Sequence, residues 1–259
     1  MDYEGFKAEI YKMSGINLSF YKEKQMKRRI ESLVRKNGYE LYEEYVQVLK
    51  GNQRLYNEFI NYLTINVSEF CRNPAQWEVL KSDIIPFLLK KSGTPKIWSA
   101  ACSTGDEPYT LVMVLNEYIP LRDIRIIATD IDREALRKAK TGVYTEKSLE
   151  KLPDTYLDKY FNKEGSIYTI KDEVKNQVVF SQHDLLKDEY PSECDMIVCR
   201  NVLIYFTEEA KIKIYTQFNK ALKKEGILFV GSTEQIILAN RYKLSPMKTF
   251  FYLKEGDLA

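Results

Sequence analysis

A turn of small residues followed by two acids is the first segment of the chain whose chemistry is distinctive. Residues 99–104 are serine, alanine, cysteine and threonine, and they lead to Gly105. Asp106 and Glu107 follow, where a helix is expected to begin. A turn of this kind lets a ligand approach backbone amides. The segment lacks the glycine spacing of a dinucleotide fingerprint, and its acids would repel a pyrophosphate. We therefore expect a cationic or hydroxyl-rich ligand here.

Asp130 is the second candidate, 25 residues after Gly105 and at the end of an expected strand. Nucleoside-binding sheets place at this point the carboxylate that accepts hydrogen bonds from ribose hydroxyls. A helix N-cap is the alternative role for Asp130, but Asp132 can supply that cap. The position therefore predicts a ribose contact.

Three further polar clusters stand at expected turns. They are Asn66, Ser68 and Arg72 after a helical region, His183–Leu186 after an expected β pair, and Cys199–Phe206 after a strongly apolar strand. Asn201, in the last cluster, emerges at the carboxyl end of its strand. For each of these polar side chains taken singly, capping of a local turn is an equally good interpretation.

The chain has one histidine, His183, and four cysteines without a C-x-x-C pair. One histidine excludes a multi-histidine metal centre, and a Ser-His or Cys-His nucleophilic mechanism would have to use this residue. We expect free thiols and no metal site. The 39 basic and 37 acidic side chains give a net charge of +2, so the overall charge favours no nucleic-acid partner.

The elements that must position these candidates predict an α/β protein. Residues 1–75 read as a small helical domain, residues 76–94 as a linker, and residues 95–259 as alternating strands and helices. Such alternation predicts a doubly wound parallel sheet that binds ligands at the carboxyl ends of its strands, near the switch in strand order. Within 145–182 we expect a small inserted antiparallel pair, formed by Tyr168–Ile170 and Gln177–Phe180. The expected strands of the main sheet are 96–101, 124–129, 195–199, 227–231 and 249–253.

Residues 21–36 predict an amphipathic helix with a strongly basic outer face. Four apolar side chains share one face of this helix: Met26, Ile30, Leu33 and Val34. Lys24, Arg28 and Arg35 project away from them, and the segment holds seven basic residues against two acids. A solvated helix surface and a docking face for an acidic partner both remain open.

Four motifs together resemble the CheR-type chemotaxis receptor glutamate methyltransferases over nearly the whole chain. They are Asn66-x-Ser68-x-Phe70-x-Arg72, the segment 98–109, the segment 128–132 and the segment 199–206. The resemblance implies a helical N-terminal receptor-docking domain and a Rossmann-like S-adenosylmethionine methyltransferase domain. It also implies an enzyme that esterifies glutamate side chains in the cytoplasmic helical regions of membrane chemoreceptors, with S-adenosylhomocysteine as product.

The same resemblance implies a set of cofactor contacts. Carried over position by position, they fall on Asn66, Ser68, Arg72, Glu107, Asp130, Asp184, Leu185, Asn201 and Val202. Glu107 is expected to favour the cationic cofactor and Asp130 to hold its ribose. The basic face formed by Lys24, Arg28 and Arg35 becomes the expected receptor-docking surface.

The chain departs from the family pattern at a few positions. Ser68 stands where members commonly have threonine, Cys71 where they have phenylalanine, and Asp184 where they have asparagine. Some members carry a glycine-rich hairpin loop that holds a peptide from the receptor's C-terminal tail. Phe161–Ile167 is short and has one glycine, so we expect activity that does not depend on such a tail.

Methyl transfer to a glutamate carboxylate requires no general base, since a reference pKa near ~4.3 leaves that acceptor ionised at neutral pH. We expect Arg72 to guide a carboxylate and Tyr205 to position the acceptor, because orientation is the remaining task. Two alternatives stay open: a nucleic-acid methyltransferase, and a non-catalytic module that binds S-adenosylmethionine and signals through partners. No apolar run reaches the ~18 to 20 residues of a membrane span. We therefore expect a cytoplasmic protein without direct membrane insertion.

Overall fold

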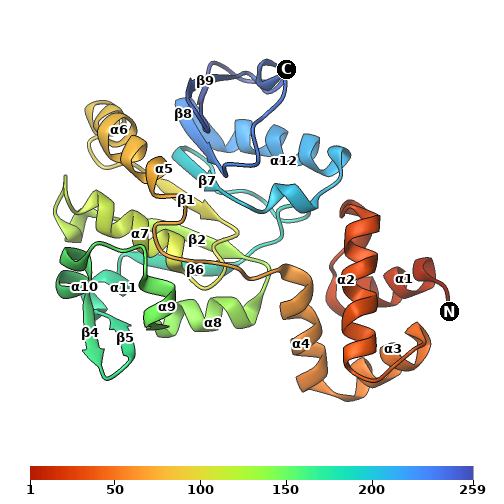
Figure 1. Ribbon diagram of the computed structural model, residues 1–259. Helices are drawn as coiled ribbons and strands as arrows, with labels where there is room; N and C mark the ends of the chain where they lie inside the picture. Colours follow the sequence, from red (N-terminus) through yellow and green to blue (C-terminus); the bar gives the residue numbers. More distant parts are fainter. Residues whose placement is uncertain (259) are drawn as a thin grey trace. The chain divides into compact units, whose positions relative to one another are not determined.

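The structure is a computed structural model that describes residues 1–258, and the chain divides into two compact units. The first unit contains Met1–Asn66 together with Leu203–Lys213, and the second contains Val67–Val202 together with the chain from Ile214 onward. The first unit is helical and the second is built on a β-sheet (Figure 1). An α/β protein with a helical N-terminal part is therefore confirmed.

The helical unit contains four α-helices in residues 1–66. They are α1 (Tyr3–Ser14), α2 (Glu23–Lys36), α3 (Tyr42–Gly51) and α4 (Gln53–Thr64), with the 3-10 helix η1 (Leu18–Phe20) after α1. Asp2 caps α1 by accepting a hydrogen bond from the amide of Gly5, and Gly15 ends the helix in the left-handed conformation. The predicted apolar stripe of α2 is confirmed, since Met26, Ile30, Leu33 and Val34 are all buried.

A short segment far along the chain completes this helical unit. It contains the 3-10 helix η4 (Leu203–Tyr205) and the start of α12 (Glu208–Ala221). The amide of Lys22 donates to the carbonyl of Tyr205 over 2.9 Å, and the amide of Thr207 donates to the carbonyl of Phe20 over 2.8 Å. Two rings, Tyr21 and Phe206, lie 4.8 Å apart.

The second unit contains a seven-stranded sheet whose order is β6-β2-β1-β7-β8-β10-β9. The strands are β1 (Ile97–Ala100), β2 (Ile126–Asp130), β6 (Val178–Gln182), β7 (Cys194–Cys199), β8 (Leu222–Val230), β9 (Leu244–Lys248) and β10 (Phe251–Lys254). The first five strands in this order run parallel, and β10 runs antiparallel to both of its neighbours, β8 and β9. Since β1 pairs with β2 on one side and β7 on the other, the strand order switches at β1. The predicted doubly wound sheet is confirmed.

Helices cover this sheet because their inner faces are apolar. α7 (Asp106–Leu115) and α8 (Arg133–Thr141) pack on β2 and β6. The 3-10 helix η3 (Leu121–Asp123) precedes β2, and η5 (Ala239–Tyr242) precedes β9. From Pro108 to Leu115 every residue of α7 is buried. This burial fixes the start of α7, and with it Asp106 and Glu107, against the ends of the strands.

Residues 76–94 are part of the second unit, although their sequence suggested a linker. They form α5 (Pro74–Val79), the π-helical turn Leu80–Ile84 and α6 (Ile85–Ser92). Trp77, Leu80 and Leu88 lie in its hydrophobic core. The apolar periodicity of this stretch requires burial, which a solvated linker would not provide.

The small inserted sheet differs from its prediction. Its order is β3-β5-β4, made of β3 (Val143–Thr145), β4 (Phe161–Glu164) and β5 (Ile167–Ile170), with α9 (Glu146–Leu149), α10 (Asp154–Tyr160) and α11 (Asp172–Lys175) around it. Tyr168–Ile170 belongs to this sheet, as predicted. The prediction that it pairs with Gln177–Phe180 is wrong. Those residues enter β6, which pairs in parallel with β2. The one-turn helix α11 separates β5 from β6 and lets β6 extend the main sheet.

Candidate functional site

The carboxyl ends of the parallel strands bring several predicted residues to one edge of the main sheet. The turn after β1 begins at Ala101, β2 ends at Asp130, and Asn201 follows β7. Gly105 in the β1 turn has a φ of 91°, and a Cβ there would lie 2.9 Å from Cβ of Ala139. Only glycine fits this close approach of the turn to α8.

Asp130 joins the turns that follow β1 and β2. Its Oδ2 accepts from the amide of Ser103 over 2.7 Å, and its Oδ1 accepts from the amide of Asp132 over 2.9 Å. Burial raises the pKa of Asp130 to about 6, although these amide bonds oppose the shift. Asp132 caps α8 by accepting from the amides of Glu134 and Ala135, as the sequence suggested. Each Asp130 oxygen keeps a lone pair that can accept from a ligand hydroxyl.

Glu107 is largely withdrawn from solvent, with 14% of its side chain exposed, and it has partners that the sequence did not predict. The hydroxyl of Ser99 donates to Oε1 of Glu107 over 2.8 Å, and Nη1 of Arg200 lies 3.4 Å from Oε2. Burial raises the pKa of Glu107, and the charge of Arg200 opposes that rise. The carboxylate therefore does not stand as an isolated negative charge for a cationic ligand, because Arg200 compensates much of it.

Arg200 also connects the end of β7 to the segment that begins α5. Its Nη2 donates to the carbonyl of Arg72 over 2.6 Å and to Oε1 of Gln76 over 2.7 Å. The guanidinium lies over the rings of Trp77, at 5.4 Å, and Phe229, at 4.8 Å. The sequence held one signal for this network. Arg200 directly follows the six residues of β7, all buried, and a charge at that place must find partners inside the protein.

Arg72 and Ser68 lie on the loop before α5. Nη1 of Arg72 donates to the carbonyl of Val67 over 2.9 Å, and its backbone carbonyl also accepts from the indole of Trp77. The Ser68 hydroxyl donates to the carboxylate of Asp106, which also accepts from Oγ1 of Thr104 over 2.6 Å. These bonds attach the loop to the start of α7, next to the β1 turn.

Asp184 and Leu185 follow β6 at the same edge of the sheet. Oδ1 of Asp184 accepts from the amide of Leu186 over 2.8 Å, which is the turn-capping role that the sequence left open. Leu185 is buried, and its carbonyl accepts from the hydroxyl of Tyr190 over 2.7 Å. Burial raises the pKa of Asp184.

Asn201 and Val202 form the turn after β7, and their backbone amides donate to the carboxylate of Glu234. Glu234 was not among the residues predicted from the sequence. Oδ1 of Asn201 is buried and has no hydrogen-bond partner within the described residues. A ligand that donates a hydrogen bond would satisfy this atom.

Two of the predicted site residues, Asn66 and Tyr205, belong to the helical unit. Nδ2 of Asn66 donates to Oγ1 of Thr64 over 3.0 Å. Tyr205 ends the 3-10 helix η4, and its backbone carbonyl accepts from the amide of Lys22. Its ring is half-buried.

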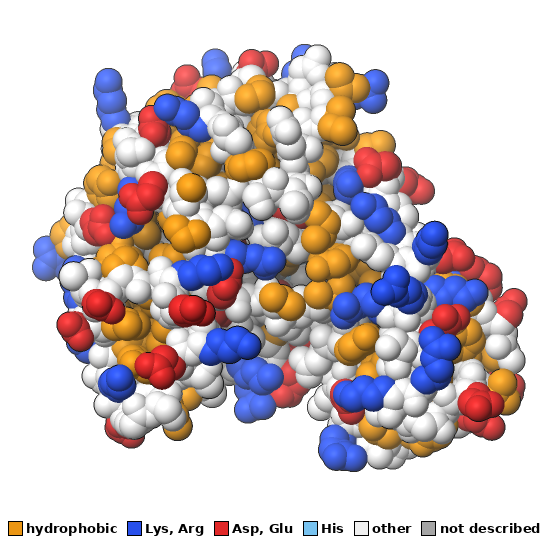
Figure 2. Space-filling model, viewed as in Figure 1, with side chains coloured by type: hydrophobic (Ala, Val, Ile, Leu, Met, Phe, Trp, Pro, Cys, Tyr) orange, Lys and Arg blue, Asp and Glu red, His pale blue; other side chains and the backbone are white. Residues whose placement is uncertain are grey.

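The predicted docking residues Lys24, Arg28 and Arg35 are exposed on α2, and none of them forms an ion pair within residues 1–258. Arg29 on the same helix differs, since its Nη2 donates to the carbonyl of Tyr62. Figure 2 shows Lys and Arg side chains gathered over the face of the helical unit on which α2 lies.

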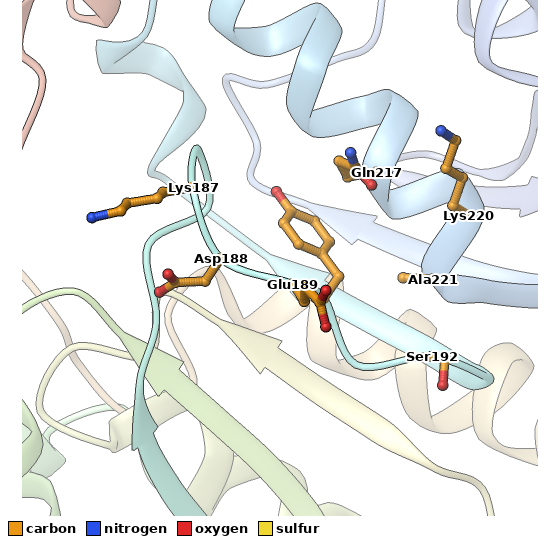
Figure 3. Close-up of a pocket in the computed structure, with 8 residues that line it drawn as sticks. Lys187, Asp188, Glu189, Ser192, Gln217, Lys220 and Ala221 are labelled. Carbon is orange, nitrogen blue, oxygen red and sulfur yellow. The ribbon is translucent and has the colours of Figure 1, made fainter.

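A pocket of about 370 Å³ lies elsewhere in the second unit, between α12 and the loop before β7 (Figure 3). Gln217 and Lys220 come from the helix, while the side chain of Lys187 points away from it. Ser192 precedes β7, so this pocket lies toward the amino ends of the strands. None of the predicted site residues lines it.

Comparisons with known proteins agree with one another. Residues 1–64 match the family described as "CheR methyltransferase, all-alpha domain", and residues 66–251 match "CheR methyltransferase, SAM binding domain". A chemotaxis protein methyltransferase of Listeria innocua is 41% identical over 254 residues, covering 98% of this chain and 97% of the relative. Its Escherichia coli counterpart is 33% identical over 258 residues, covering 95% and 88%. Among solved structures, PKMT2 from Rickettsia typhi in complex with AdoHcy is 22% identical and covers 53% of this chain and 20% of its own. The TM-score of this match is 0.35, a value that supports no conclusion.

Proposed function

Because the chain belongs to the CheR methyltransferase family, we propose that it transfers a methyl group from S-adenosylmethionine to glutamate side chains of membrane chemoreceptors. The products would be glutamate methyl esters and S-adenosylhomocysteine. The observation that carries this proposal is the match of both family domains, together with relatives named as chemotaxis methyltransferases over nearly their full length. The family's larger domain binds S-adenosylmethionine, so this cofactor and the initial resemblance are confirmed.

The residues at the strand ends fit an adenosine-containing cofactor. Asp130 offers acceptor lone pairs where a ribose is expected, and the unpartnered Oδ1 of Asn201 offers a buried acceptor. We assign contacts with the bound cofactor to the whole strand-end set and to Asn66. That set contains Ser68, Arg72, Glu107, Asp130, Asp184, Leu185, Asn201 and Val202.

When bound, S-adenosylmethionine supplies an electrophilic methyl group on a sulfonium. The acceptor carboxylate is ionised at neutral pH, so the chain has to orient it and exclude competing acceptors. We propose that the guanidinium of Arg72 grips a carboxylate, since two parallel N–H donors match its two oxygens. Tyr205 is proposed to position the acceptor glutamate.

We propose a second role for Glu107 beside its contact with the cofactor. Since Arg200 faces Oε2 and Ser99 donates to Oε1, the carboxylate is held rigidly and only part of its charge acts on the cofactor. We propose that the Glu107–Arg200 pair sets the orientation of the Arg72 loop, because Nη2 of Arg200 holds the carbonyl of Arg72.

We assign receptor docking to the N-terminal helical region and methyl transfer to the sheet domain; of the residues 1–75 predicted for the helical region, Met1–Asn66 lie in the helical unit. The exposed Lys24, Arg28 and Arg35 support an acidic helical partner, because long-range attraction raises the rate of encounter. The two residues between β4 and β5, Gly165 and Ser166, make a tight hairpin, which supports independence from a receptor tail. Four buried free thiols support a cytoplasmic location, since reducing compartments keep thiols reduced.

Transfer of labelled methyl from S-adenosylmethionine to purified receptor cytoplasmic fragments tests this proposal. We expect label that is released by mild base, as an ester requires, and equal labelling of fragments with and without their C-terminal tail. RNA and DNA serve as competing acceptors in parallel reactions. Label on nucleic acid would favour the alternative methyltransferase, and tight S-adenosylhomocysteine binding without any transfer would favour the non-catalytic module. Labelling that needs the tail would refute tail independence.

A further inference from the structure

A buried carboxylate, Glu234, lies behind the turn that follows β7. Its Oε2 accepts from the amide of Asn201 over 2.5 Å and from the amide of Gly231 over 2.9 Å, and its Oε1 accepts from the amide of Val202 over 2.8 Å. The residue is 6% exposed. Three backbone donors on one carboxylate are an unusual concentration, and they come from the ends of two neighbouring strands.

These amides need an acceptor because the sheet ends before them. The pairing of β7 with β8 stops at Cys199 and Val230. Asn201 then takes a φ of 62°, in the left-handed region, which asparagine adopts more readily than most residues other than glycine. This turn takes the amides of Asn201 and Val202 out of the sheet, and the carboxylate of Glu234 accepts from both.

Gly231 shows how closely this joint is packed. A Cβ at Gly231 would lie 2.5 Å from Oε2 of Glu234 and 2.8 Å from the amide nitrogen of Asn201. No side chain fits at that place. The end of β7, the end of β8 and the Glu234 carboxylate therefore form one rigid unit, the Glu234 joint, which consists of Asn201, Val202, Gly231 and Glu234.

We propose that Glu234 is a positioning residue for the cofactor site, acting through Asn201 and Val202 without touching the cofactor. The Glu234 joint holds the turn that carries Oδ1 of Asn201, a buried acceptor that lacks a partner within residues 1–258. This inference rests on the proposed assignment of Asn201 and Val202 to the cofactor.

Asp195 provides a matched control at the opposite end of the same strand. It is a buried carboxylate, 2% exposed, near the amino end of β7. It accepts from the amide of Lys96 over 2.8 Å, from the hydroxyl of Ser92 over 2.6 Å and from Nζ of Lys223 over 3.0 Å. Its network is as extensive as that of Glu234, but it lies away from the carboxyl edge.

The test compares Glu234→Gln with Asp195→Asn in the full-length chain. The glutamine keeps the size of the side chain but replaces one acceptor oxygen with an amide donor, so an N–H of the turn loses its partner. Binding of S-adenosylhomocysteine is measured by titration calorimetry, and the melting temperature is measured without ligand. We expect both variants to melt earlier. Affinity should fall at least tenfold in Glu234→Gln and less than twofold in Asp195→Asn.

A double-mutant comparison separates positioning from general stability. In an Asn201→Ala background, Glu234→Gln should weaken S-adenosylhomocysteine binding by less than twofold, because the contact that it positions is already absent. If Glu234→Gln does not fold, Glu234→Asp replaces it. Aspartate keeps the charge but shortens the reach, and an intermediate loss of affinity is expected.

Several results would overturn the inference: unchanged affinity in Glu234→Gln, an equal loss in Asp195→Asn, or full additivity with Asn201→Ala. These readouts need no methyl transfer. A wild-type chain that binds S-adenosylhomocysteine but never methylates receptors would therefore refute the proposed function and leave the role of Glu234 to be decided by binding. A wild-type chain that methylates receptors, with normal binding in Glu234→Gln, would refute this inference alone.

Discussion

Replacing Asp130 with asparagine should separate the stability of the protein from its affinity for the cofactor. Asparagine has nearly the same shape, so the two turns after β1 and β2 can keep their course. It has one oxygen where aspartate has two, and both oxygens of Asp130 accept backbone amides, from Ser103 and Asp132. It also cannot ionise.

The effect on stability follows from the pKa of Asp130, which burial raises from 3.8 to about 6. The folded state binds the proton of the Asp130 carboxyl more tightly than the unfolded state does. The stability that this protonated carboxyl contributes is therefore fully present below pH 3.8 and is lost as the pH rises through about 6. At ~1.4 kcal/mol per pKa unit, the buried ionised carboxylate costs about 3 kcal/mol at neutral pH. An amide left without its acceptor costs about 1 to 3 kcal/mol. The asparagine variant should therefore be between equally stable and about 2 kcal/mol more stable at pH 7.

The effect on affinity has the opposite sign. A hydrogen bond to a charged acceptor contributes roughly 1.5 to 3 kcal/mol, so loss of one ribose contact should weaken S-adenosylhomocysteine binding by about 10- to 100-fold. In the wild-type protein the affinity should also fall as the pH drops below about 6, because protonation removes the ionised acceptor. The variant should lack this part of the pH dependence.

Titration calorimetry from pH 5 to 8 and thermal melts without ligand measure both effects. Burial also raises the pKa of Asp106 and Glu107, but these carboxyls are present in both proteins, so the difference between the two isolates Asp130. His183 is a neighbour of Asp130, because its backbone amide donates to the carbonyl of Asp130. A His183→Gln variant therefore serves as the control that lacks the imidazole. Equal affinity in wild type and variant, or the same pH dependence in both, would refute the ribose assignment. Early melting with intact affinity would make Asp130 a structural residue.

Three further sets of substitutions test the roles of Arg72, of the basic face of α2 and of Arg200. Arg72→Ala should lower methyl transfer at least 100-fold with little change in melting temperature, because the side chain is half-buried and its hydrogen bond to a carbonyl stays within its own loop. Early melting with normal turnover per folded molecule would contradict this role. Reversing Arg28 and Arg35 to glutamate should raise the KM for receptor and flatten its salt dependence while leaving cofactor affinity unchanged, and an unaltered KM would place docking elsewhere. Arg200→Met should cost about 3 to 5 kcal/mol of stability by leaving Glu107 largely buried without a cation, and adding Glu107→Gln should restore part of it. Calorimetric melts of the single and double variants that show simple additivity would argue against this pairing.

Local patterns in the sequence were sufficient for much of the scaffold. The apolar repeat of α2 predicted both the helix and its buried stripe, because residues three and four apart share a helix face whatever surrounds them. Asp132 was recognised as a helix cap for the same reason, since its partners are two and three residues away. The strand ends that hold Asp130 and Asn201 followed from short apolar runs with polar residues after them.

Local patterns thus predicted the N-terminal helical part, five strands of the main sheet and the types of residue at its carboxyl edge, but not the helices within residues 76–94 or strand β9. Two pairings depend on the packing of the folded chain: Glu107 with Arg200, 93 residues apart, and Glu234 with Asn201, 33 residues apart. The same packing also decided that β6 joins the main sheet and not the small one. A strand or a buried charge can satisfy its hydrogen bonds with several partners, and the sequence pattern around it is the same for each. The choice depends on which surfaces the whole chain buries together, because a charge withdrawn from water is stable only beside the group that packing brings to it.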